Sequence, residues 1–196
     1  MSYQEYAAEF LGTFALCFVV WLSVAFQMPF STPVMAAVTL GLFVYTVGGI
    51  SGAHLNPAVT IGMFSANKIK TNDALMYVVC QLAGAAVAMT VGRLMSGQIA
   101  SVTHAVTLTA GIGEAIGAFF LAFGVMSATI QKIPPAAAGL VVGSSLLIGI
   151  YAAFPFSNAI INPAVALSVN SFGPMEILGP LVGAVCGAWA RVKLEK

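Results

Sequence analysis

Long apolar segments alternate with short polar connections along the chain, and six of these segments are long enough to cross a lipid bilayer. A spanning helix needs about 20 predominantly apolar residues. The longest connection, residues 96–109, is rich in small and Ser/Thr residues and places His104 in a solvated loop. The pattern predicts an all-α membrane protein. The expected spans are residues 6–26, 34–51, 74–95, 110–130, 136–155 and 174–191.

Two further apolar segments, residues 57–66 and 163–170, are too short to cross a bilayer. Each follows an irregular stretch, residues 52–56 in the first case and residues 156–162 in the second. The same tripeptide marks the start of each segment. Asn is a good N-cap and Pro is tolerated at the first helical position, so both copies predict the start of a half-helix. The two tripeptides are Asn56-Pro57-Ala58 and Asn162-Pro163-Ala164.

The two halves of the chain, roughly residues 1–100 and 105–196, show the same order of elements. Residues 8–14 resemble residues 113–119 near the start of each half. Each half holds three spans, an odd number, so the second half enters the membrane from the opposite side. We therefore expect residues 1–196 to form one transmembrane channel domain with an inverted three-plus-three repeat. Short, Pro-interrupted segments at matching positions of two such halves indicate a site near the membrane midplane.

Composition supports a membrane location and excludes several classes of function. Of the 196 residues, 60% are hydrophobic and 7% are charged, whereas a soluble domain carries about 25% charged residues. The net charge of +1 gives no indication of a nucleic-acid partner. The three cysteines lie in apolar runs without metal-ligand spacing, and no nucleophile–base pair is visible. We expect no cofactor, no metal site, no catalytic residue and no enzymatic activity.

The distribution of positive charge predicts the orientation. In this topology all the lysines and Arg191 fall on one side of the membrane, and Arg93 falls on the other. The positive-inside rule puts the lysine-rich side, together with both termini, in the cytoplasm. The first half-helix then enters from the cytoplasm and the second from outside. We expect a multi-pass protein of the cell membrane.

The irregular stretches before the half-helices are candidates for lining a pore. Non-helical backbone at membrane depth is tolerated only when it is buried in protein or lines a water-filled cavity. Each half-helix N-terminus carries roughly +0.5 elementary charge, which repels cations and protons from a narrow lumen. We expect Asn56 and Asn162 to offer side-chain NH₂ groups to a passing solute. The other expected lining residues are Gly52, Ala53, His54, Asn158, Ile160 and Ile161.

Two carboxylates, Glu9 and Glu114, lie inside spans at matching positions of the two halves. Ionisable groups inside a membrane are expensive and usually functional. Each Glu can anchor an irregular loop by accepting hydrogen bonds from its backbone N–H groups, or it can couple solute transport to proton movement. The residues favour the anchoring role and leave the coupling role open.

At this point the sequence resembles the aquaporin, or major intrinsic protein, family over nearly its whole length. The resemblance rests on SGAHLNPAVT at residues 51–60, on the second tripeptide at residues 162–164 and on AEFLGTF at residues 8–14. It implies six spanning helices, two half-helices and a homotetramer with one pore in each subunit. Further matching positions are Gln81, Glu114, Pro155 and Asn158.

One departure from the family pattern concerns the solute. In the family an Arg directly follows the second tripeptide and lines an outer selectivity constriction, whereas this chain has Val165 there. The resemblance puts the other constriction positions at Ala36, Ile150 and Ala159. A water-selective member usually shows an aromatic residue, a His and the Arg. The resemblance therefore implies an atypical, apolar constriction.

The function implied by the resemblance is passive conduction of water and of other small uncharged solutes, such as glycerol, ammonia or hydrogen peroxide. Ions and protons would be excluded by the paired half-helix N-termini and the Asn-Pro-Ala motifs. Two alternatives remain. An inverted-repeat secondary transporter would need a titratable group near the midplane. A gated or mainly structural membrane protein would have a nearly closed pore.

Overall fold

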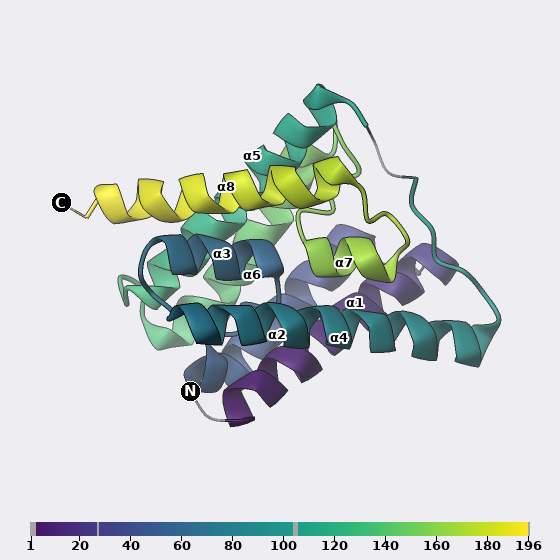
Figure 1. The fold of residues 1–196 in the computed structure, drawn as a ribbon, viewed down its shortest axis with the longest axis horizontal. Helices are drawn as coiled ribbons and strands as arrows, with labels where there is room; N and C mark the ends of the chain where they lie inside the picture. Colours follow the sequence, from purple (N-terminus) through teal and green to yellow (C-terminus); the bar gives the residue numbers. More distant parts are fainter. Residues whose placement is uncertain (1–2, 27, 104–105, 196) are drawn as a thin grey trace.

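The computed structural model describes residues 3–26, 28–103 and 106–195, and these ranges form eight α-helices (Figure 1). The predicted all-α membrane fold with six spans and two half-helices is confirmed. His104 lies outside the described residues. Six helices are long and apolar enough to cross a membrane: α1 (Tyr3–Phe26), α2 (Thr32–Ser51), α4 (Thr71–Ser96), α5 (Leu108–Thr129), α6 (Pro135–Ala153) and α8 (Pro174–Lys193). The two short helices are α3 (Pro57–Ser65) and α7 (Pro163–Ser168).

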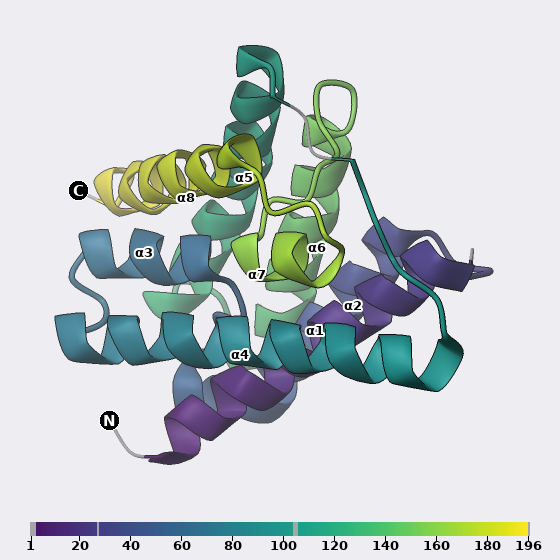
Figure 2. The same ribbon diagram turned by 45° about the vertical axis from the view of Figure 1, so that its right-hand side comes forward.

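Helix packing follows the same scheme in both halves of the chain. The first spanning helix of each half packs against the second and third, α1 against α2 and α4, and α5 against α6 and α8. The two halves meet where α2 packs on α6. Short helix α3 lies between α4 and α8, as both ribbon views show (Figures 1 and 2). The short helix α3, which belongs to the first half of the chain, therefore packs against a helix of the second half.

Glycines allow the first and third spans of each half to approach closely. A Cβ atom on Gly84 of α4 would lie 2.5 Å from the carbonyl oxygen of Phe10 on α1. At the matching crossing, a Cβ on Gly183 of α8 would overlap the carbonyl oxygen of Ala115 on α5. Without a hydrophobic driving force between helices in lipid, close backbone contact is a main source of association. Small residues at these two crossings are thus required by the fold.

Each half-helix starts at its Asn-Pro-Ala tripeptide. The side chain of Asn56 accepts a hydrogen bond from the backbone N–H of Ala58, and Asn162 accepts one from Ala164. The prolines occupy the first helical position, where the missing N–H would have no intrahelical partner anyway. Helix α7 ends two residues before the predicted position, because Asn170 takes a left-handed conformation with φ of 52°. Asn adopts this conformation more readily than most residues, and it commonly ends helices.

Candidate functional site

The two half-helices meet at their N-termini, and their capping asparagines cross-link the two irregular loops. The Asn56 side-chain nitrogen donates to the Ile161 carbonyl oxygen at 3.0 Å, and the Asn162 nitrogen donates to the Leu55 carbonyl oxygen at 3.0 Å. The NH₂ groups that we expect to be offered to a solute are thus each partly engaged within the protein. Each amide uses one of its two hydrogens to hold the opposite loop, and both Asn side chains line the cavity described below.

The backbone of both loops is strained at equivalent positions. Leu55 has a φ of 48° and Ile161 has a φ of 46°, and both side chains are fully buried. Ala53 and Ala159 share this left-handed conformation, with φ of 48° and 53°. For an L-residue other than Gly, the left-handed conformation costs about 1–2 kcal/mol. Strain of this kind persists only where the surroundings impose it, and it gathers at functional sites.

The first loop is held by the carboxylate of Glu9, which is fully buried. One oxygen accepts hydrogen bonds from the Ser51 hydroxyl at 2.7 Å and the His54 backbone N–H at 2.9 Å. The other oxygen accepts from the Leu55 backbone N–H and the Gln81 side chain, both at 2.8 Å. Four donors on one carboxylate leave it occupied by the loop and by α4.

The second loop is held in the same way by Glu114, which is 1% exposed. Its two oxygens accept from the backbone N–H groups of Ile160 at 3.0 Å and Ile161 at 2.6 Å. Like Glu9, it is not among the residues that line the two cavities described below. Both carboxylates thus bond to the strained loops on the side that faces away from these cavities.

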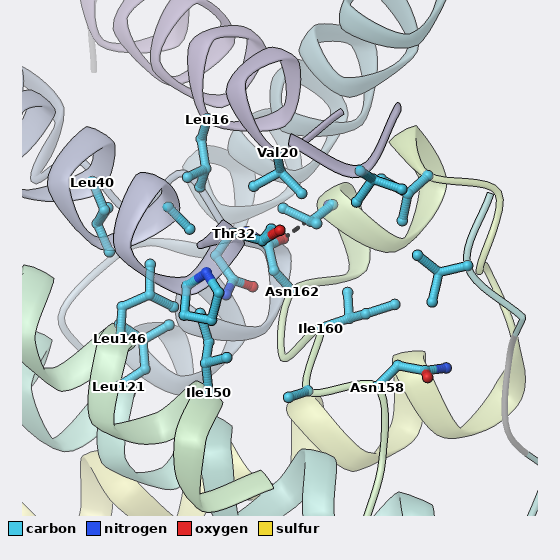
Figure 3. A pocket seen from close by; sticks show the side chains of 18 of the residues that line it. Leu16, Val20, Thr32, Leu40, Leu121, Leu146, Ile150, Asn158, Ile160 and Asn162 are labelled. Atoms are coloured by element: carbon cyan, nitrogen blue, oxygen red, sulfur yellow. Dashed lines mark hydrogen bonds between the residues drawn. The ribbon is translucent and has the colours of Figure 1, made fainter. Parts of the chain in front are cut away.

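A cavity of about 400 Å³ opens in front of the loops, and both capping asparagines line it. Figure 3 shows Asn162 among the apolar side chains of its wall. The sequence-predicted constriction residues Ala36, Ile150, Ala159 and Val165 all line this cavity. Its lining is predominantly apolar and, within the described residues, includes no Asp, Glu, Lys or Arg. Further apolar side chains on its wall are Leu16, Val20, Leu40, Leu121, Leu146 and Val169.

A second, larger cavity of about 920 Å³ lies on the lysine-bearing side of the protein. We call the larger cavity the wide cavity and the smaller one the narrow cavity. Lys68 and Lys132 line it, and His54 lines both cavities. The hydrogen bond from Lys132 to Glu195, 2.9 Å long, lowers the pKa of that carboxyl. The His54 ring is fixed by its Nδ1, which lies 3.1 Å from the Thr60 hydroxyl. His54 therefore stands where the narrow cavity meets the wide one.

The other predicted lining residues divide into two groups. Gly52 lines the wide cavity, whereas Asn158 and Ile160 line the narrow one. Ala53 and Ile161 line neither, and this part of the prediction is corrected. Both side chains are buried instead, with 1% of Ala53 and 0% of Ile161 exposed, and Ile161 packs against glycines of α5 and α6. The Pro and Ala residues of both tripeptides are buried at the helix starts, namely Pro57, Ala58, Pro163 and Ala164.

Some residues at the site were not assigned a role from the sequence. Thr60 joins His54 to Gln81 because its hydroxyl oxygen lies 2.9 Å from the Gln81 side-chain nitrogen. Tyr77 donates to the Ser51 carbonyl at 2.9 Å. Val102 lies in the connection between α4 and α5 and lines the narrow cavity. Only the folded arrangement of distant segments brings these side chains to the loops.

Comparison with known proteins gives consistent matches. The sequence profile described as "Major intrinsic protein" matches residues 1–191. Aquaporin NIP1-1 of Arabidopsis thaliana is 33% identical over 95% of this chain and 72% of its own length. Nodulin-26 of Glycine max is 34% identical over 95% of this chain and 76% of its own length. The X-ray structure of the aquaglyceroporin from Plasmodium falciparum matches with a TM-score of 0.70 and 25% identity, covering 98% of this chain and 95% of that one.

Proposed function

The chain belongs to the major intrinsic protein family, so it is an integral membrane channel for water and small solutes and not an enzyme, and we propose that its solutes are uncharged and pass through an apolar outer neck. Besides water, the proposed solutes are glycerol, ammonia and hydrogen peroxide. The observation that carries the proposal is the narrow cavity, whose wall joins both capping asparagines to the four constriction residues.

We assign the outer neck to Ala36, Ile150, Ala159 and Val165, which all line the narrow cavity. Because Val165 takes the place of the family's Arg, the neck offers neither a fixed positive charge nor a strong donor. A neutral solute can shed water there and hydrogen-bond again at the asparagines. An ion would lose hydration without gaining a partner, which costs far more than desolvating a neutral polar group. An apolar neck can also close by dewetting.

Exclusion of protons and cations is assigned to the paired helix N-termini. The positive ends of α3 and α7 face the same narrow passage, where Asn56 and Asn162 hold the loops together. Fixed dipoles of this kind oppose positive charge at the midplane. With no Arg at position 165, this region carries more of the electrostatic barrier than in relatives that have the Arg.

A proton-coupled transporter fits the geometry less well. It would need a carboxylate facing the solute path, whereas Glu9 and Glu114 are engaged by loop donors and lie off the cavity walls. Flux should therefore rise linearly with the solute gradient and show no saturation.

We also propose that both termini are cytoplasmic, that the protein resides in the cell membrane and that it forms a homotetramer. Lys68 and Lys132 border the wide cavity, and Arg191 and Lys193 lie in the last turn of α8. Positive charge concentrated on one side favours the cytoplasmic placement of that side. The tetramer rests on family resemblance.

The test uses proteoliposomes with a trapped pH-sensitive dye and an imposed osmotic or solute gradient. The proposal expects osmotic water flow above that of protein-free liposomes, solute flux linear in the gradient, and no added proton leak. Saturable uptake driven by a pH gradient would contradict the proposal and favour the transporter.

A further inference from the structure

Part of the connection between α4 and α5 is tied across the outer side of the narrow cavity. We call residues 97–103 the outer strap. Figure 1 shows this connection running from the end of α4 past α7 towards α5. The Val102 backbone N–H donates to the Val169 carbonyl at 3.0 Å, and the Asn158 side chain donates to the Thr103 carbonyl. The strap is therefore bonded to both segments that flank α7.

A third contact links the outer strap to the body of the protein. The Asn170 side-chain nitrogen donates to the Ala100 carbonyl at 2.8 Å. Its oxygen accepts from the Arg93 guanidinium, also at 2.8 Å. Asn170 thus uses both ends of its amide to join α4 to the strap. Ala100 is 1% exposed, which shows that the strap packs into the structure at this point.

These contacts place Val102 beside the helical turn that carries Val165. The Val169 backbone N–H donates to the Val165 carbonyl at 3.1 Å, so Val169 lies one turn beyond Val165. The strap bonds to the carbonyl of that same Val169. Val102, Val165 and Val169 all line the narrow cavity. The connection thus adds an apolar side chain to the wall where the charged residue is missing.

We propose that Val102 is a further specificity-determining residue of the outer neck, and that the outer strap holds it there through Asn170. This inference rests on the proposed function, because it assigns the upper size limit for neutral solutes to this side chain together with the four constriction residues. A shorter side chain at position 102 should admit larger solutes, and a bulkier one should exclude them.

The experiment compares glycerol and water permeabilities of wild type, Val102→Ala and Val102→Phe in proteoliposomes with matched protein content. A change of about one methylene in an apolar pocket alters discrimination by about ten-fold or more. Val102→Ala should raise the glycerol-to-water ratio by about that factor, and Val102→Phe should lower it. Val106→Ala is the matched control, since Val106 lies in the same connection but is 71% exposed.

A second variant, Asn170→Asp, tests the strap contact itself. Asp keeps an acceptor for Arg93 and tolerates the left-handed conformation, but it cannot donate to the Ala100 carbonyl. The glycerol-to-water permeability ratio of Asn170→Asp should rise, as in Val102→Ala. If wild type conducts water and glycerol but both Val102 variants keep its glycerol-to-water permeability ratio, this inference alone is overturned. Absence of wild-type flux would overturn the proposed function and this inference with it.

Discussion

At the scale of single residues, we propose that Val165 sets the chemical character of the outer neck. It lines the narrow cavity at the position that directly follows the second Asn-Pro-Ala tripeptide. An Arg at this position would supply a positive charge and five hydrogen-bond donors to the cavity wall, whereas Val supplies only an apolar side chain. We therefore propose that solutes are selected by their size and by the cost of their desolvation rather than by hydrogen bonding.

Val165→Arg should restore a charged constriction. We expect glycerol permeability to fall by at least about ten-fold, because the guanidinium narrows the neck by more than one methylene. Water permeability should fall less. Val165→Met is the control for added length without charge. A glycerol-to-water ratio in Val165→Arg equal to that of wild type would contradict the role given to Val165.

Glu9→Gln separates anchoring from proton coupling. The Gln side chain has one acceptor oxygen in place of two, so at least one buried loop donor loses its partner, which costs about 1–3 kcal/mol of stability. The oxygen of Gln81 has no hydrogen-bond partner in the described structure, so rotation of its amide can meet the new NH₂ group. Thermal unfolding in detergent should shift downwards while water permeability for each folded channel is retained. Lost flux in a folded variant of normal thermal stability would favour proton coupling.

At the scale of elements, the sequence predicted much, because hydrophobic length and capping residues act locally. All six spans and the starts of α3 and α7 at Pro57 and Pro163 follow from these rules. The end of α7 was predicted two residues too late, although Asn170 is of a type that commonly ends helices, and its side chain also contacts Arg93 and the outer strap. The burial of Ala53 and Ile161 also could not be predicted, because it depends on packing against other helices, as Ile161 packs against Gly117 and Gly149.

The crossing of α1 and α4 gives a prediction at this scale. Gly84→Ala places a Cβ 2.5 Å from the Phe10 carbonyl, so the helices must separate. Overpacking of this kind costs about 1–3 kcal/mol, and thermal stability in detergent should fall accordingly. Gly49→Ala is the control, because a Cβ there meets no atom within 4 Å. Equal stability of the two variants would show that the close crossing contributes nothing.

At the scale of the whole molecule, the inverted repeat brings two matching loops to one point. Each loop has a left-handed residue before its Asn, a buried Glu behind it and a cross-bond to its counterpart. The repeat in the sequence predicted that the loops correspond. It did not predict that Asn56 and Asn162 bind each other's loop, since that needs the relative placement of both halves.

Topology follows from the same arrangement. With six spanning helices both termini lie on one side, and the positive charge near Lys68, Lys132 and Arg191 predicts the cytoplasm. Reporter proteins fused to either terminus should both give cytoplasmic signals in intact cells. Signals on opposite sides, or both outside, would contradict this orientation.

The central claim, that this protein is an uncharged-solute channel with an apolar outer neck, is tested most directly by stopped-flow light scattering on wild-type proteoliposomes, with water and glycerol gradients run side by side. The account predicts that both permeabilities rise well above those of protein-free liposomes, because Ala36 and Ala159 keep the neck open. Fast water flux without glycerol flux would contradict this, since it would mean that Ile150 and Val165 close the neck to anything larger than water.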